Sequence, residues 1–245
     1  MKIEAAPPEH PGNAPVTEPP SVGILMLETN FPRIPGDIGH AASWDFPVRY
    51  RMVSGASAER VVQQGAQGLL SAFIAAGNVL VAEGVAGIAT SCGFLSIFQQ
   101  RIAAELPVPV ATSSLLQGPL IQALLPIGKR VGILTFSAQC LTGQHLAAAG
   151  IPADAPVVGL DDSLAFYPAI AEDRAELDVA QAERDMLAAA NQLVRRYPEV
   201  GAILLECTNM APYSAAIART TGLPVYDVVN FIHWFHSGLR PRRFR

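Results

Sequence analysis

Cysteine is scarce in this sequence. The 245 residues contain three cysteines, at positions 92, 140 and 207, with no CxxC pair among them. An odd and widely spaced set argues against a disulfide framework. Because a CxxC pair and a histidine-rich segment are both missing, we also expect no structural zinc site or other metal site.

Long apolar runs are missing as well. A membrane-spanning helix needs about 20 uninterrupted apolar residues, and the best candidate, residues 69–90, is interrupted at Gly77, Glu83 and Gly87. The first residues lack the apolar segment of a secretory signal. We therefore expect a cytoplasmic protein that does not bind membranes.

Charged residues make up only 16% of the chain, and the formal net charge is −4. This balance argues against nucleic acid as a partner. The one basic cluster, residues 240–245, is typical of a solvated end or an oligomer contact. Half of the residues are hydrophobic, which is enough for a large buried core.

After a proline-rich start, short apolar runs alternate with helical patterns. Residues 1–20 predict a flexible leader. The apolar runs predict buried parallel strands at 21–27, 85–90, 108–112, 130–136, 156–160, 200–205 and 224–229, and an alternating pattern predicts a further strand at 48–53. Apolar residues that recur about every four positions predict helices between them, the longest at 58–76 and 172–196. The fold class is therefore α/β with parallel sheets.

Three features occur twice in the same order. Val-Gly-Ile-Leu at 22–25 returns at 131–134, Cys92 has a counterpart in Cys207, and Pro-Val at 109–110 returns at 224–225. This repetition predicts two pseudo-symmetric domains, each a four-stranded parallel sheet flanked by helices. The first comprises residues 21–115 with the C-terminal helix 230–245, and the second comprises residues 116–229. Both cysteines would then face the cleft between the domains.

Cys92 and Cys207 each end an apolar strand and precede a helical pattern. The start of a helix carries unpaired N–H groups and the positive end of a dipole. This position predicts a lowered thiol pKa and a place for a substrate carboxylate. A buried cysteine is otherwise usually an inert core residue, which is our interpretation of Cys140 because it has no counterpart in the first half.

Several small or polar residues near these strand ends are candidates for binding the substrate. Gly93 would let the backbone approach a ligand, and Arg33 lies in a loop after the first strand, where α/β proteins commonly bind ligands. The others supply hydroxyl or amide groups beside the second cysteine or at the matching strand end of the second half. The candidates are Arg33, Gly93, Thr135, Ser137, Thr208 and Asn209.

Two facing thiols predict proton transfer at a carbon acid. If one is deprotonated and the other protonated, the carbon can lose a proton on one face and gain one on the other. Fixed hydrogen-bond donors at the carboxylate would stabilise the enolate-like intermediate. The expected function is therefore racemisation or isomerisation of a small carboxylate without a cofactor.

At residues 90–93 (Thr-Ser-Cys-Gly), 131–135 (Val-Gly-Ile-Leu-Thr) and 206–208 (Glu-Cys-Thr), the chain resembles the aspartate/glutamate racemase superfamily. This superfamily includes hydantoin racemases, maleate isomerases and arylmalonate decarboxylases, and the resemblance covers the chain after residue 20. It implies two pseudo-symmetric α/β domains with the active site between them, and Cys92 and Cys207 as acid and base. A small carboxylate is the expected partner, and a homo-oligomer is left open.

The chain also departs from the amino-acid racemases of that superfamily. Gly93 and Phe94 stand where those enzymes have Asn-Thr, and Glu206 stands where they have glycine. The presence of both cysteines favours proton transfer on two faces over decarboxylases, which keep one cysteine. Maleate isomerase-like chemistry, an arylmalonate decarboxylase-like lyase and a non-catalytic carboxylate-binding protein remain alternatives, and the substrate and stereochemistry stay open.

Overall fold

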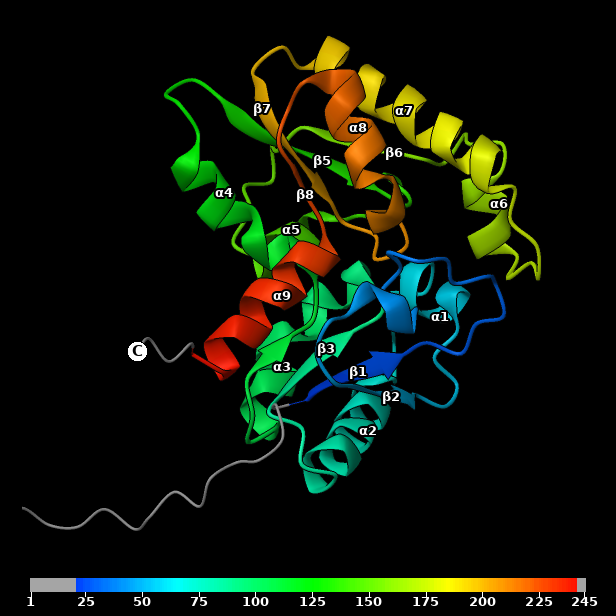
Figure 1. Cartoon of the computed structure of the whole chain (residues 1–245), viewed down its shortest axis with the longest axis vertical. Coiled ribbons are helices and arrows are strands. Elements are labelled where there is room, and N and C mark those ends of the chain that lie inside the picture. Colours follow the sequence, from blue (N-terminus) through cyan, green and yellow to red (C-terminus); the bar gives the residue numbers. More distant parts are fainter. Residues whose placement is uncertain (1–20, 242–245) are drawn as a thin grey trace, which may run out of the picture.

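The computed structural model describes residues 21–241, in which two α/β halves lie one above the other (Figure 1). The leader predicted for residues 1–20 lies outside the described residues. All eight predicted strands are present, and most are shorter than the apolar runs. They are β1 (Val22–Met26), β2 (Val48–Met52), β3 (Gly87–Thr90), β4 (Val110–Ala111), β5 (Arg130–Thr135), β6 (Val157–Gly159), β7 (Val200–Leu205) and β8 (Val225–Tyr226).

The strands form two separate four-stranded sheets with the same topology. The first has the order β2-β1-β3-β4 and the second β6-β5-β7-β8, and every pair of neighbours is parallel. Position by position, β1 corresponds to β5 and β3 to β7. The predicted fold class, two pseudo-symmetric parallel α/β units, is confirmed, and β3 and β7 are the strands that lead into the two cysteines.

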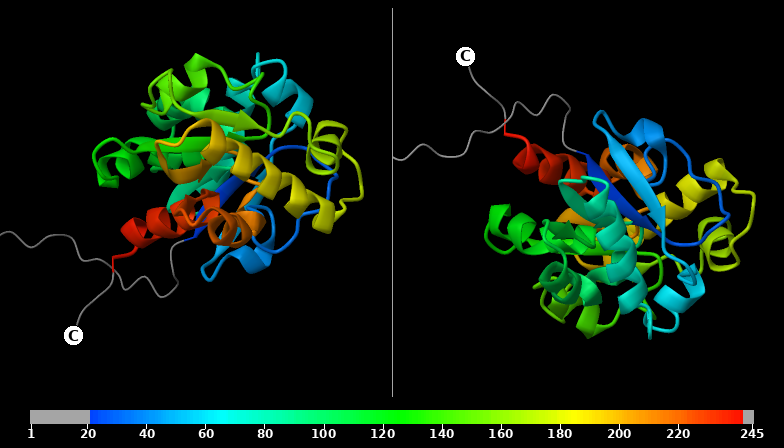
Figure 2. Two further views of the ribbon diagram at one scale, coloured as in Figure 1. Left: turned by 90° about the horizontal axis from the view of Figure 1, so that it is seen from above. Right: turned by 90° about the horizontal axis from the view of Figure 1, so that it is seen from below.

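Helices cover both faces of the first sheet. The helix α2 (Leu70–Ala82) lies on one face, where the backbone of Gly23 approaches the Leu80 side chain closely. The last helix, α9 (Val228–Leu239), returns from the second half and covers the other face, where Phe235 lies against Gly87. Figure 2 shows α9 in red alongside the blue strand β1. The C-terminal helix is therefore part of the layer structure of the first half.

The second sheet is covered in the same way. The helix α7 (Val179–Arg196) packs on the face that carries Gly132, and α8 (Ser214–Thr221) lies beside α7. The helix α4 (Gly118–Leu124) packs on the opposite face, where its first residue lies near Leu204. The remaining helical segments are η1 (Ala41–Ser43), α1 (Ala58–Val62), η2 (Gly93–Phe98), α3 (Gln99–Glu105), η3 (Ser114–Gln117), α5 (Gly143–Ala148), α6 (Phe166–Ala171) and η4 (Ala211–Tyr213).

Two predicted helices have different bounds in the structure. The helix predicted at 58–76 is divided into α1 and α2, because Gly65, Ala66 and Gly68 all adopt positive φ angles that a right-handed helix does not allow. The helix predicted at 172–196 begins later, at Val179, where the Asp178 side chain accepts a hydrogen bond from the N–H of Gln181 and caps the first turn.

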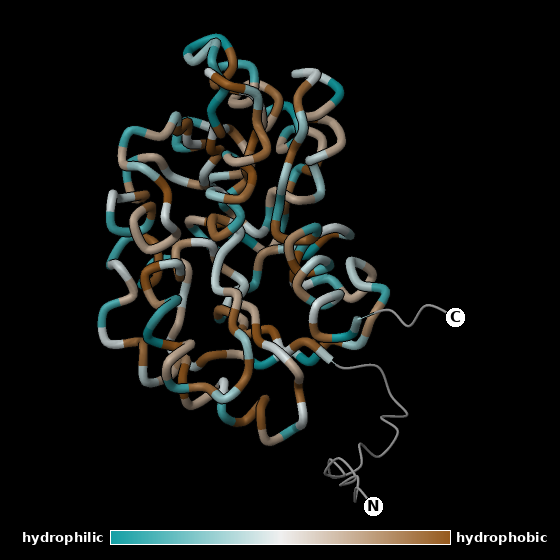
Figure 3. The backbone as a smooth tube through the Cα atoms, turned by 90° about the vertical axis from the view of Figure 1, so that its left-hand side faces the viewer, coloured by the Kyte–Doolittle hydropathy of each residue, from teal (hydrophilic) through white to brown (hydrophobic). Residues whose placement is uncertain are grey.

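The apolar core follows the strands. In Figure 3 hydrophobic segments run through the interior of each half, and hydrophilic segments gather in the outer loops. One cluster extends across both halves, and a second joins the first sheet to α9 through residues such as Ile24, Ala89 and Ile232. Within residues 21–241, no helix is long and apolar enough to cross a membrane.

Candidate active site

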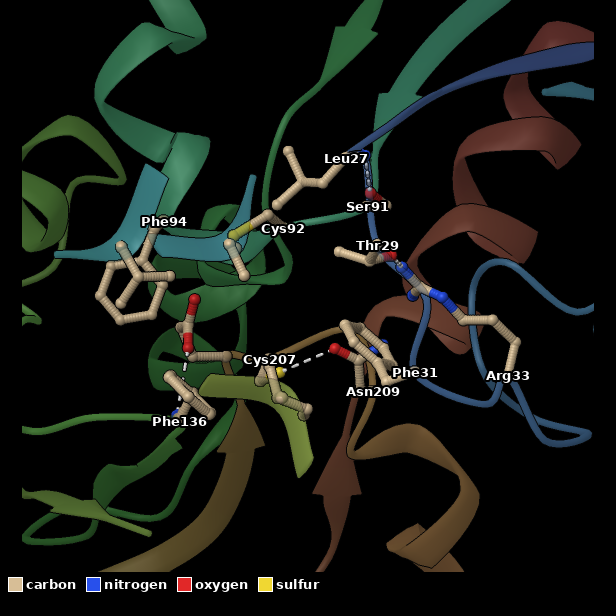
Figure 4. Close-up of a pocket in the computed structure, with 15 residues that line it drawn as sticks. Leu27, Thr29, Phe31, Arg33, Ser91, Cys92, Phe94, Phe136, Cys207 and Asn209 are labelled. Carbon is tan, nitrogen blue, oxygen red and sulfur yellow. Dashed lines mark hydrogen bonds between the residues drawn. The ribbon is translucent and has the colours of Figure 1, made fainter. Parts of the chain in front are cut away.

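Cys92 and Cys207 line one cavity where the carboxyl ends of the two sheets meet (Figure 4). The cavity is narrow and mostly apolar, with a few polar groups. This is the usual composition of a small-molecule site. Its lining residues are Leu27, Thr29, Phe31, Arg33, Ala58, Val62, Ser91, Cys92, Gly93, Phe94, Phe136, Ile170, Glu206, Cys207 and Asn209.

Strand β3 and its neighbours hold Cys92 in place. The N–H of Ser91 continues the sheet by donating to the carbonyl of Leu25, and the Ser91 hydroxyl accepts a hydrogen bond of 2.9 Å from the N–H of Leu27. Cys92 then has extended backbone angles and caps η2. Strand β3 is fully buried up to this point, so the position of the Cys92 thiol is fixed by rigid neighbours.

Cys207 holds the equivalent position after β7. The N–H of Glu206 donates to the Leu134 carbonyl, which continues the second sheet by one residue. The Cys207 thiol donates a hydrogen bond of 3.4 Å to the side-chain oxygen of Asn209. Asn209 in turn donates a hydrogen bond of 2.6 Å to Asp37, so a residue from the first half orients the amide beside the second thiol.

Both thiols have raised pKa values. Burial raises the pKa of Cys92 to about 12, and the negative charge of Glu206 adds to the rise, although the N–H of Phe94 opposes it. Burial also raises the pKa of Cys207 well above its usual value, with Glu206 again the next cause and the N–H of Asn209 opposing it. The lowered thiol pKa expected from the sequence is wrong, because the segments that follow are short 3-10 turns and burial outweighs their N–H groups.

Glu206 is fully buried in the same cavity wall. Its Oε2 accepts hydrogen bonds of 2.9 Å from the Thr135 hydroxyl and 3.5 Å from the N–H of Phe136, whereas its Oε1 has no hydrogen-bond partner. Burial raises the pKa of this carboxyl to about 7, and the two hydrogen bonds oppose the rise. A side chain on Gly93 would lie 2.2 Å from Oε1, so only glycine leaves room for this carboxylate.

Arg33 provides a positive group at another part of the wall. Its guanidinium donates hydrogen bonds of 3.0 Å to Asp37 and 2.9 Å to the Thr29 hydroxyl, and it lies 4.4 Å from the centre of the Phe31 ring. Its charge also lowers the pKa of Cys92, the least of the causes that act on this thiol. In Figure 4 Arg33 and Thr29 lie on one side of the thiols, and Phe94 and Phe136 lie on the other.

No family model matches the chain, but its sequence is similar to those of known proteins. It is 31% identical over 237 residues to a dimethylsulfoniopropionate lyase from Durusdinium sp. clade D, an alignment that covers 93% of this chain and 78% of the relative. It is 30% identical over 236 residues to dimethylsulfoniopropionate lyase 7 from Emiliania huxleyi (strain CCMP1516), covering 91% and 68%. The chain belongs to the dimethylsulfoniopropionate lyase family.

Solved structures of other enzymes have the same fold as this member of the dimethylsulfoniopropionate lyase family. A mutant of arylmalonate decarboxylase in a sulfate-associated form has a TM-score of 0.64 at 16% identity, covering 92% of this chain and 96% of the other. Allantoin racemase from Klebsiella pneumoniae has a TM-score of 0.63 at 15% identity, covering 89% and 87%. Aspartate racemase from Picrophilus torridus has a TM-score of 0.58 at 15% identity, covering 92% and 95%. The chain therefore shares the fold of these enzymes, as its resemblance to the aspartate/glutamate racemase superfamily implied.

The sequence relatives and the proteins that share the fold are all named as enzymes, and they differ in reaction. The sequence relatives are named as lyases, whereas the structures of the same fold include racemases and a decarboxylase. The racemase activity expected from the sequence is therefore not confirmed.

The structure brings some of the predicted binding residues to the cavity and leaves others outside its lining. Arg33, Gly93 and Asn209 line it with the two cysteines. The remaining three have other contacts. The Thr135 hydroxyl donates to Glu206, the Thr208 hydroxyl donates to the Ser91 carbonyl at 2.7 Å, and the Ser137 hydroxyl donates to Asp161.

Glu206 is the charged residue of the cavity lining to which sequence reasoning assigned no role. The signal was present, since a glutamate directly follows the continuous apolar strand Val200–Leu205. Cys140 is half-buried, packs against the apolar core and lies outside the cavity lining. Among residues 21–241 no group of three or more His, Cys, Asp or Glu side chains is placed to hold a metal ion.

Proposed function

We propose that this chain is a lyase that acts on dimethylsulfoniopropionate or a close sulfonium carboxylate. A thiolate of the cavity takes the proton from the carbon next to the carboxylate. The electron pair of that C–H bond forms a carbon–carbon double bond as the bond from the next carbon to sulfur breaks. Dimethyl sulfide leaves as a neutral molecule, acrylate remains, and the proton stays on the thiol.

The observation that carries this proposal is the pair of thiols in one cavity of a chain that is 31% identical to a named lyase. The α-proton of a carboxylate is weakly acidic, so the base must be strong. A thiol whose pKa is raised, as burial raises that of Cys92 to about 12, gives a strongly basic thiolate once it is deprotonated. In the ligand-free cavity the thiol form predominates, so substrate binding must favour the thiolate.

The substrate carboxylate is expected to lie towards Arg33, Thr29 and Asn209. Guanidinium is the side-chain group best suited to carboxylate recognition, because its donors match the two oxygens. Negative charge builds up on these oxygens as the α-proton leaves. Hydrogen-bond donors with fixed positions stabilise the transition state, in which this charge has built up. They lower the barrier because they do not have to reorganise during the reaction.

The test is release of dimethyl sulfide from dimethylsulfoniopropionate, measured in the gas above the reaction by chromatography. We expect wild type and Cys140→Ala to be active, because Cys140 lies outside the cavity lining. We expect Cys92→Ala and Cys207→Ala each to lose activity by at least about 100-fold, the scale of a lost acid–base group. Full activity in both cysteine variants, or no release by the wild type, would refute the proposal.

Racemisation of a small carboxylate is the second candidate. The matching positions of Cys92 and Cys207 after β3 and β7 favour it, because racemisation needs an acid–base group on each face of the carbon. It predicts exchange of the α-proton with solvent deuterium and loss of optical activity in a chiral carboxylate, with no dimethyl sulfide released from the sulfonium compound. The two reactions are thus separated by their products.

A further inference from the structure

Glu206 is a buried carboxylate that has no ion-pair partner in the part of the chain that the structure describes. It is fully buried, and within residues 21–241 none of the ion pairs involves it. Arg33, the cation of the cavity wall, is paired with Asp37 instead. One oxygen of Glu206, Oε1, has no hydrogen-bond partner. A buried polar atom without a partner is costly and is usually explained by a function.

The protein makes room for this carboxylate and still leaves it unpaired. Gly93 lies so close that any side chain there would collide with Oε1, and the Thr135 hydroxyl holds the other oxygen at 2.9 Å. These contacts fix the carboxyl group in the cavity wall next to both thiols. They stabilise its position, but they do not compensate the negative charge.

Aromatic rings surround the same end of the cavity. Phe94 follows Gly93, and the N–H of Phe136 donates to Oε2 of Glu206. In Figure 4 the Phe94 and Phe136 rings lie on the side of the thiols opposite to Arg33. A carboxylate with aromatic faces is the environment that binds a quaternary or sulfonium cation, which cannot donate conventional hydrogen bonds. The cavity therefore has a positive end and a negative, aromatic end, with the thiols between them.

We propose that Glu206, with Phe94 and Phe136, is the binding site for the onium group of the substrate, opposite the carboxylate site at Arg33. The inference rests on the proposed function for the identity of the cation as a sulfonium. It also extends that function, because it assigns the selectivity for a zwitterion to one side chain. The carboxylate end alone would accept any small acid, whereas Glu206 selects acids that carry a positive tail.

The contact between the onium group and Glu206 also affects the pKa of the two thiols. The charge of Glu206 contributes to the raised pKa of both Cys92 and Cys207. A bound cation beside Glu206 compensates that charge, so it lowers the thiol pKa when the substrate arrives. The onium group thereby favours the thiolate that the elimination requires, and an acid without the cation does not.

Two unreactive ligands of equal shape test the assignment. One is the trimethylammonium analogue of the substrate, and the other carries a tert-butyl group in place of trimethylammonium. Their dissociation constants are measured by calorimetry at about pH 8, where Glu206 is ionised. We expect the wild type to bind the cation roughly tenfold more tightly than the tert-butyl acid. In Glu206→Gln we expect the order to reverse, because an apolar wall favours the apolar ligand.

The matched control is Glu59→Gln, the same chemical change at an exposed residue outside the cavity lining. It should keep the wild-type preference. Equal binding of both ligands by the wild type, or an unchanged preference in Glu206→Gln, would overturn the assignment. Both outcomes are independent of turnover, so they are distinct from a failure to release dimethyl sulfide, which would refute the proposed function alone.

If Glu206→Gln does not fold, the wild type provides the same test by pH. The groups that face Glu206 are the thiols of Cys92 and Cys207, and His145 lies behind the Phe94 ring. Burial raises the pKa of both thiols and lowers that of His145 from 6.5, so all three groups are mostly neutral between about pH 6.5 and 8. The preference for the cation should therefore grow as the pH rises through about 7, the pKa of Glu206. A preference that is constant over this range would contradict the proposal.

Discussion

The hydroxyl of Thr208 donates a hydrogen bond of 2.7 Å to the backbone carbonyl of Ser91, across 117 positions of sequence. Both residues are buried, and each is next to one of the two cysteines. The bond therefore joins the end of β3 directly to the end of β7. The relative position of the two thiols depends on this contact between the halves as well as on the sheets that carry them.

Replacing Thr208 by valine tests this link. Valine has nearly the same shape, but it leaves the buried Ser91 carbonyl without its side-chain donor, so we expect a loss of about 1–3 kcal/mol of unfolding free energy. We also expect lower activity, because the thiols are no longer held together. Denaturant unfolding and release of dimethyl sulfide are the measurements. Thr208→Ser keeps the hydroxyl and should stay close to the wild type, and equal losses in both variants would show that the bond is unimportant.

Gly93→Ala should disturb the active site through Glu206. The added methyl group would lie 2.2 Å from Oε1 and also 2.2 Å from the backbone carbonyl oxygen of Glu206, so the strand end has to move. We expect a loss of at least about 1–3 kcal/mol in unfolding free energy and most of the activity. Gly143→Ala is the control, because a methyl group there meets nothing within 4 Å. Wild-type stability in Gly93→Ala would contradict the tight contact.

The buried carboxyl group also makes stability depend on pH. The pKa of Glu206 is raised from 4.5 in the unfolded chain to about 7 in the folded protein, so the folded state binds this proton more tightly. Its stabilising contribution is complete below 4.5 and is lost as the pH rises through 7. Between those values we expect the unfolding free energy of the wild type to fall by about 3 kcal/mol relative to Glu206→Gln. Parallel pH profiles for the two proteins would contradict the raised pKa.

The fold could be predicted because buried parallel strands leave a strong signal. Residues such as those of β3 and β7 are covered on both faces, so each strand is a continuous apolar run, and the cysteines follow at equivalent points. The division of the helix predicted at 58–76 could not be predicted from apolar spacing, because it depends on the backbone angles of Gly65 and Gly68. The spacing of apolar residues indicates which face of a helix is buried, but it does not indicate where the helix is interrupted.

The site was only partly predictable for a related reason. Strand ends identify the thiols, but the direction of a side chain depends on tertiary contacts. Ser137 follows a strand end as expected, yet its hydroxyl donates to Asp161. Glu206 would ordinarily be expected to pair with a cation, and the sequence cannot reveal that none of the ion pairs among residues 21–241 involves it. Walls such as Phe31 and Ile170 come from loops and a short helix whose positions depend on the packing of both halves.

The raised pKa values of Cys92 and Cys207 can be tested through the reactivity of the two thiols. Alkylation by iodoacetamide requires the thiolate, and burial followed by the charge of Glu206 raises the pKa of both Cys92 and Cys207. In a Cys140→Ala background we expect both thiols to react more slowly at about pH 8 than free cysteine, whose pKa is about 8.5. Mass spectrometry of the labelled peptides measures each thiol separately.

Glu206→Gln in that background should shift both alkylation profiles to lower pH. Glu206 is ionised wherever the thiols titrate, because its pKa of about 7 is well below theirs, so its charge opposes every thiolate that forms. Removing the charge leaves burial as the main cause, so the shift should be partial, and each thiol should still react more slowly than free cysteine. Glu59→Gln should leave the profiles unchanged. A shift for one thiol alone would mean that Glu206 acts on a single acid–base group, and the cation bound beside it would then activate only that one.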